Sequence, residues 1–228
     1  TGDSITHNGS WTQGMNSYSE WFEQYLYMTG RGDDSVFNTG WGGADIQDFL
    51  YEKDTPKGNG VFADPGMGLE QFITKYNPDV VFIKLGMNNR GMKNADFIKL
   101  YNQMLDGIYS EGAKNGKTPK VILLSPTPLS GEFGISSGEF GSDPTTESYR
   151  DSVKRFSIML DGIAQERGLE FVDLRQAMID ESINLGDRYH YTFFTDGSDG
   201  KIHPNAAGQY CMFQTICKDL GLYDATMP

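Results

Sequence analysis

The sequence predicts an α/β protein with three layers, in which helices cover both faces of a central parallel sheet. Two observations carry this prediction. Short runs of consecutive apolar residues alternate with longer segments whose apolar residues recur every three or four positions. Consecutive apolar residues are typical of strands that are buried on both faces of a parallel sheet. The 228 residues give room for one α/β domain of ordinary size, so we expect a single domain over residues 1–228.

Four segments are expected to form strands. Three of them are rich in consecutive apolar residues, and the second of these is stopped by Pro126 and Pro128. The remaining segment is short and ends at Gly40. In chain order, the expected strands are Val36–Asn38, Asp79–Leu85, Lys120–Ser125 and Leu169–Leu174.

Four further segments have the apolar periodicity of helices that bury one face. Three long stretches that are rich in glycine and polar residues lie between the elements. Loops of this length in a compact domain are more often functional than idle. The expected helices are Tyr18–Met28, Ala95–Ser110, Ser148–Glu166 and a last one from about Asn205; the irregular stretches are Glu52–Gly68, Leu129–Thr146 and Gly186–Gly200.

The charge balance excludes two kinds of partner. Acidic residues outnumber basic ones by 31 to 19, so a net charge of −12 would repel nucleic-acid phosphates and anionic lipid surfaces. No apolar run approaches the roughly 20 residues that span a bilayer, so we expect no membrane insertion. Cys211 and Cys217 face away from each other on the last expected helix, which predicts two buried thiols and no disulfide.

Four short blocks carry residues that suit ester hydrolysis. This chemistry requires a hydroxyl nucleophile, a base, a group that orients the base, and donors for an oxyanion. Each block alone also fits an ordinary turn, a strand end or, for His203, the approach to a helix that Asn205 caps. Their joint occurrence favours one shared site. The blocks are residues 2–6 (GDSIT), 38–45 (NTGWGGAD), 86–89 (GMNN) and 199–205 (DGKIHPN).

Each block offers one part of such a site. Ser4 follows a glycine and an aspartate that permit a tight turn, and it is the candidate nucleophile. His203 is one of three histidines, and Asp199 lies four residues before it, close enough to reach the imidazole. Gly43 can present a bare backbone N–H. Asn88 follows a buried strand, at the edge where open α/β sheets bind their ligands.

Together, the blocks resemble those of the SGNH (GDSL-type) hydrolase superfamily, and they extend from Ser4 to His203. The resemblance implies a flavodoxin-like α/β/α sandwich and a serine ester hydrolase. It implies that Ser4 is the nucleophile and, through its N–H, the first oxyanion donor. Gly43 and Asn88 match the other oxyanion donors, His203 matches the base, and Asp199 matches the acid that orients the base.

The chain departs from the family pattern in three places. The family usually has Asp-x-x-His, and the spacing here is one residue longer; Asp199 is the predicted acid and Asp196 the alternative. Asn89 stands where the family commonly has an aspartate. The family's first strand precedes Gly-Asp-Ser, and a sheet without it would have an exposed edge. We therefore expect further residues upstream of Thr1 in the natural protein.

The predicted substrate is a small-molecule or carbohydrate ester, from which the enzyme removes a small acyl group, above all acetyl. Aromatic residues in the expected rim segments suit sugar rings, although ordinary packing is the alternative for them. Asp3, Trp41 and Tyr191 are the predicted substrate contacts. No residues have zinc-ligand spacing and no phosphate-binding glycine motif occurs, so no metal or cofactor is expected.

Other functions of the same fold stay open at this point. They are a lipase or acylhydrolase that acts on lipids or thioesters, a weakly active carbohydrate-binding domain, and a domain that transfers acyl groups to sugars. Because polysaccharides lie outside cells, we expect a secreted or periplasmic protein.

Overall fold

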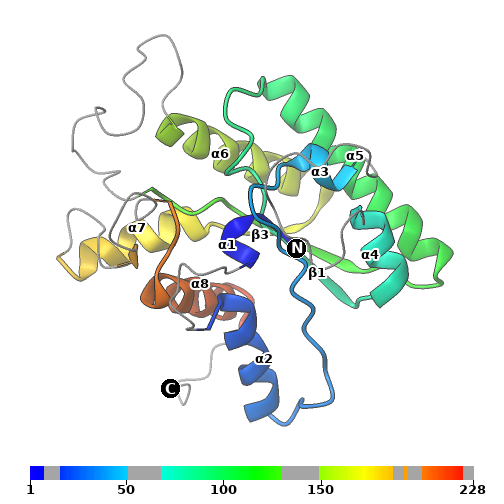
Figure 1. Cartoon of the computed structure of the whole chain (residues 1–228), viewed down its shortest axis with the longest axis horizontal. Coiled ribbons are helices and arrows are strands. Elements are labelled where there is room, and N and C mark those ends of the chain that lie inside the picture. The colour runs from blue at the N-terminus through cyan, green and yellow to red at the C-terminus, as the bar shows by residue number, and fades with distance from the viewer. Residues whose placement is uncertain (8–15, 51–67, 130–148, 187–192, 195–201, 223–228) are drawn as a thin grey trace.

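The computed structural model describes residues 1–7, 16–50, 68–129, 149–186, 193–194 and 202–222 (Figure 1). Within this part of the chain, three parallel strands form a sheet in the order β1-β2-β3. Ile83 lies opposite Leu123, and Leu124 lies opposite Val172, so the strands end near one another at their carboxyl edge. The strands are β1 (Val80–Ile83), β2 (Lys120–Leu124) and β3 (Glu170–Val172), each inside a segment that the sequence predicts to be a strand.

The four predicted helices are present, and α2 has the predicted bounds. A capping box starts α2, in which Ser17 Oγ accepts the Glu20 N–H and the Glu20 carboxylate accepts the Ser17 N–H. The predictions missed the other helices of the described residues, of which two are short. The helices are α1 (Ser4–His7), α2 (Tyr18–Met28), α3 (Ile46–Leu50), α4 (Leu69–Tyr76), α5 (Asn94–Lys114), α6 (Tyr149–Arg167), α7 (Leu174–Asn184) and α8 (Ala206–Asp219).

The residues of β2 alternate between the two faces of the sheet, as the period of a strand requires. Val121 and Leu123 pack in one apolar cluster with α3, α4, α5 and most of α6. Ile122 and Leu124 pack in the other cluster with α1, α2, α7 and α8. Figure 1 shows these two groups of helices on opposite sides of the strands. The three-layer α/β arrangement that the sequence predicts is therefore confirmed.

The segment Thr1–Asp3 lies alongside β1 and makes the hydrogen bonds of a strand. Gly2 forms parallel bridges with Lys84 on one side and Gly40 on the other. The Asp3 N–H donates to the Lys84 carbonyl at 3.3 Å, and the Trp41 N–H donates to the Gly2 carbonyl at 2.9 Å. Because Lys84 directly follows β1, this segment delivers Ser4 to the carboxyl edge of the sheet.

The predicted strand at Val36–Asn38 is wrong, since none of its residues is in a strand and Gly40, further along the segment, makes the bridge with Gly2. Asn38 uses its side chain instead. Its Nδ2 donates to the Thr6 carbonyl at 2.6 Å and to Ser19 Oγ at 2.9 Å, and its Oδ1 accepts the Gly40 N–H at 2.9 Å. These bonds fix the segment against α1 and α2 without a strand ladder.

Close backbone contacts explain two of the glycines in this region. A Cβ atom on Gly2 would lie 2.6 Å from the Lys84 carbonyl oxygen. A Cβ atom on Gly40 would lie 2.4 Å from the His7 nitrogen and 2.7 Å from the Thr6 carbonyl carbon. Backbone atoms cannot rotate away as a flexible side chain can, so any larger residue at these positions would push α1 off the sheet.

Gly40→Ala should therefore lower the free energy of unfolding by about 1–3 kcal/mol, the usual cost of forcing an extra methyl group into a tight site. Denaturant unfolding followed by circular dichroism measures the change. Gly162→Ala is the matched control, because no atom of the described residues outside its own stretch of helix lies within 4 Å of the added Cβ, and alanine favours the interior of α6. Equal stabilities of Gly40→Ala and the wild type would contradict the close approach described above.

Candidate active site

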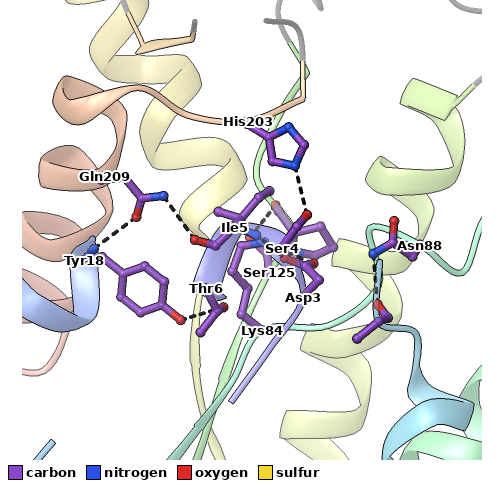
Figure 2. Close-up of polar contacts among 12 residues, drawn as sticks. Asp3, Ser4, Ile5, Thr6, Tyr18, Lys84, Asn88, Ser125, His203 and Gln209 are labelled. Carbon is purple, nitrogen blue, oxygen red and sulfur yellow. Dashed lines mark hydrogen bonds and ion pairs between the residues drawn. The ribbon is translucent and has the colours of Figure 1, made fainter. Parts of the chain in front are cut away.

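Ser4 and His203 are in direct contact. Ser4 is the first residue of α1, and its Oγ lies 2.9 Å from His203 Nε2 (Figure 2). The His203 side chain is buried with 8% exposure, whereas Ser4 is partly exposed. The other ring nitrogen of His203 points away from Ser4 (Figure 2). A hydroxyl and an imidazole at this distance can exchange a proton directly.

The residues around His203 explain how its ring is placed. Pro204 forms an antiparallel bridge with Phe194. Asn205 caps α8 by accepting the Gly208 N–H on its Oδ1 at 3.0 Å, and its Nδ2 donates to the Phe194 carbonyl at 3.1 Å. The sequence offered helix capping by Asn205 as the alternative explanation of this region. Asn205 does cap the helix, and His203 contacts Ser4 as well.

Asp3 is the N-cap of α1, the helix whose first residue is Ser4. Its Oδ1 accepts the Ile5 N–H at 3.0 Å, and its carbonyl accepts the His7 N–H at 3.0 Å. The Asp3 side chain is fully buried. The expectation that Asp3 contacts the substrate is therefore wrong, because no surface of this carboxylate faces a cleft.

Lys84 is a part of the site that the sequence predictions missed. Its Nζ lies 3.3 Å and 3.4 Å from the two carboxylate oxygens of Asp3, and neither side chain has any exposure. Burial lowers the pKa of Lys84, and the negative charge of Asp3 acts in the opposite direction. The signal in the sequence that could have identified Lys84 is the presence of a lysine inside an otherwise apolar strand segment.

Gln209 is a second missed residue, and it joins three helices. Its Nε2 donates to the Ile5 carbonyl of α1 at 3.1 Å, and its Oε1 accepts the Tyr18 N–H of α2 at 3.0 Å (Figure 2). The Tyr18 hydroxyl in turn lies 2.9 Å from Thr6 Oγ1. Since Gln209 belongs to α8, these bonds couple the helix that carries Ser4 to the helix that follows His203.

Asn88 and Gly43 lie on two neighbouring turns. A hydrogen bond from the Asn89 N–H to the Gly86 carbonyl closes the turn that contains Asn88. Asn88 Nδ2 donates to the Ala44 carbonyl at 2.9 Å, which orients the amide (Figure 2). Gly43 is exposed and has a φ of 77°, the left-handed region that the third residue of a type II turn requires. The structure therefore brings the second and third blocks together.

The remaining predicted site residues divide into two groups. Trp41 is 8% exposed, and its ring packs edge-on against Phe49 at a centroid distance of 5.6 Å. This tryptophan belongs to the apolar core, so the expectation that it offers a face to a sugar is wrong. Tyr191, Asp199 and Asp196 lie outside the described residues.

A polar cavity of about 400 Å³ opens beside Asn88. Its lining includes Asp45, Arg90 and Lys99 in addition to Asn88.

Among the described residues, no three His, Cys, Asp or Glu side chains are placed to hold a metal ion. None of the helices in the described ranges has the length and apolar character that a bilayer crossing requires. Cys211 and Cys217 are buried free thiols.

A serine and a histidine in contact at the carboxyl edge of a parallel sheet define a hydrolase of the serine class. The model of the GDSL-like Lipase/Acylhydrolase family matches residues 1–210, and the chain belongs to this family. It is a serine hydrolase of carboxylic esters, and its substrate is a small-molecule ester. No curated protein matches the chain.

Several solved structures share the fold. The acetyl xylan esterase AlAXEase is 19% identical with a TM-score of 0.69, and 95% of this chain and 96% of that chain are covered. A catalytic mutant of Axe2, an acetylxylan esterase from Geobacillus stearothermophilus, is 18% identical with a TM-score of 0.63, with 100% and 94% covered. The native aryl esterase of M. smegmatis is 18% identical with a TM-score of 0.63, with 96% and 95% covered.

Gln209→Leu should lower the free energy of unfolding by about 3 kcal/mol, because it leaves a buried carbonyl and a buried N–H without partners. It should also lower kcat, since α1 and α8 lose their shared restraint. Thermal unfolding and ester hydrolysis measured on the same preparation check both effects. Gln214→Leu, at a half-buried position on the same helix, is the control and should change neither by much. A Gln209→Leu variant with wild-type stability would contradict the bridging role.

Proposed function

We propose that the protein removes acetyl groups from carbohydrate esters through an acyl-enzyme on Ser4. The observation that carries the proposal is the 2.9 Å contact between Ser4 Oγ and His203 Nε2. Ser4 Oγ attacks the ester carbonyl carbon while His203 takes the hydroxyl proton. The tetrahedral intermediate then expels the alcohol, which receives the proton from His203. Water attacks the acyl-enzyme in the same way and releases the free acid and Ser4.

The oxyanion of each tetrahedral intermediate would be stabilised by three donors in this proposal. The Ser4 N–H lies in the first turn of α1, where backbone N–H groups have no partner within the helix. The Gly43 N–H lies in an exposed turn, and Asn88 has a second amide N–H besides the one that binds the Ala44 carbonyl. Each donor of this kind is typically worth about 3 kcal/mol in the transition state. Asp199 is the proposed acid for His203, with Asp196 as the alternative.

Two observations support a carbohydrate as the alcohol half of the ester. The polar cavity beside Asn88 offers carboxylate, amide and cationic groups that can bind sugar hydroxyls. The similar structures include two acetyl xylan esterases. Because polysaccharides lie outside cells, the proposal includes export to the periplasm or the medium.

Hydrolysis of p-nitrophenyl acetate by the purified chain tests the proposed roles. Ser4→Ala should lower kcat by at least about 10³-fold, since the variant lacks the hydroxyl that forms the acyl-enzyme in this proposal. Asp199→Asn should lower kcat by up to about 10⁴-fold, the loss known for a triad acid, and Asp196→Asn should have far less effect. The reverse order for the two aspartates would make Asp196 the acid. Full activity of Ser4→Ala would refute the mechanism.

The acyl preference should favour short chains. The turnover of p-nitrophenyl acetate should exceed that of the octanoate, because the proposed substrate carries its bulk and polarity on the alcohol side of the ester. A series of p-nitrophenyl esters of increasing chain length measures this preference, and acetylated xylo-oligosaccharides test the alcohol side. Equal or faster hydrolysis of the octanoate would indicate a lipase and contradict the acetylesterase proposal.

A further inference from the structure

A buried ion pair lies directly behind the candidate nucleophile. The Lys84 ammonium contacts both carboxylate oxygens of Asp3, and both side chains are completely buried. The backbone of Lys84 binds the same segment, since its carbonyl accepts the Asp3 N–H at 3.3 Å and its N–H donates to the Thr1 carbonyl at 3.0 Å. Ser4 is the next residue along the chain. Figure 2 shows Lys84 and Asp3 below Ser4, on the side opposite His203.

Stability alone does not account for this pair. Removing two charges from water costs several kcal/mol per ion, and a buried pair is often replaced by apolar residues at no loss of stability. Capping alone does not account for it either, because asparagine caps a helix about as well as aspartate and needs no buried cation. The pair provides a charged acceptor, the Asp3 carboxylate, for the Ile5 N–H. The Lys84 ammonium lies 3.3 Å from this carboxylate and compensates its negative charge.

The compensation of the Asp3 charge depends on Lys84. Tyr101 of α5 is fully buried, and burial first and the charge of Asp3 second raise the pKa of its phenol, so Tyr101 stays neutral. The ion pairs of the described residues give Asp3 one partner, Lys84. Without the ammonium, a buried negative charge one residue from Ser4 would oppose the negative charge that develops on the oxyanion.

We propose that Lys84 is a positioning residue of the ester hydrolysis, which acts through Asp3. It fixes the Asp3 carboxylate as the cap of α1, and it cancels the carboxylate charge behind the reacting oxygen of Ser4. This inference rests on the proposed function in that Ser4 is taken as the nucleophile. Lys84 touches neither substrate nor His203 in this role.

A double-mutant cycle on the whole chain tests the proposal. Lys84→Met removes the ammonium and keeps the length of the side chain, and Asp3→Asn removes the carboxylate charge and keeps a capping oxygen. Each single variant should lower kcat for p-nitrophenyl acetate about 10- to 100-fold, with KM changed by less than about threefold, because a displaced nucleophile loses rates of this order. The double variant should regain most of the loss, because it has no uncompensated charge.

Ile83→Val provides the matched structural control. Ile83 is fully buried at the end of β1, directly before Lys84, and its apolar side chain packs in the cluster that contains Val121 and Leu123. This substitution should lower Tm without lowering kcat of the folded enzyme. If the kcat losses of Lys84→Met and Asp3→Asn simply multiply in the double variant, the two residues act independently and the proposal is overturned.

Histidine NMR provides a readout that does not need an active enzyme. The chain has three histidines, so a ¹⁵N-histidine spectrum is simple, and His203→Gln assigns the His203 signals. Lys84→Met should shift the Nε2 signal of His203, which reports its hydrogen bond to Ser4, and the double variant should restore it. An Nε2 signal that is identical in the wild type and Lys84→Met would overturn the proposal.

The two kinds of failure are distinguishable. A wild-type chain that hydrolyses no ester would refute the proposed function, while the NMR comparison would still decide whether Lys84 positions Ser4. If Lys84→Met does not fold, the double variant is compared directly with the wild type. It should then fold and show the wild-type Nε2 signal, and a displaced signal would count against the proposal.

Discussion

The hydrogen bond between Ser4 and His203 joins two residues that are 199 positions apart, and its 2.9 Å length depends on structure that touches neither atom. The first turn of α1 places Ser4, and the residues before α8 place His203. A displacement of about 1 Å at a reacting group can cost a rate on the order of 10²-fold. The bonds that Gln209 and Asn205 make therefore matter more for the site than their individual net energies of about 1 kcal/mol suggest.

The same constraint explains where the buried polar groups lie. Apolar side chains fill the space between the helices and the sheet, but apolar packing has little directional preference. At the carboxyl edge of the strands, hydrogen bonds between polar groups fix how the neighbouring strands and helices are oriented. Ser125, directly after β2, donates to Asp173 Oδ1 at 3.0 Å and accepts the Arg175 N–H at 2.9 Å, which ties the end of β2 to the start of α7. Such groups are tolerated in the interior because their partners are present.

Local patterns predicted the layers of the fold, because the periods of strands and helices are properties of neighbouring residues. The helix α7 was missed because the expected strand Leu169–Leu174 runs through Asp173, whose carboxylate in fact caps α7 by accepting the Gln176 N–H at 3.0 Å. The motif blocks predicted which hydroxyl and imidazole would meet. Lys84 and Gln209 could not be predicted in the same way, because the side chains of these two residues bind partners 81 and 204 positions away along the chain.

The burial of Asp3 follows from the same long-range contacts and gives the block around Ser4 a physical meaning. Gly2 is required because Lys84 and Thr6 approach its Cα too closely for any Cβ. This close approach buries the next side chain completely, so a carboxylate there has to be neutralised by the protein itself. Lys84 is the residue that pairs with Gly2 on the β1 side, and its ammonium therefore reaches the carboxylate from the neighbouring position in the sheet. The glycine, the aspartate and the lysine thus form one unit, and the backbone position of Ser4 depends on all three.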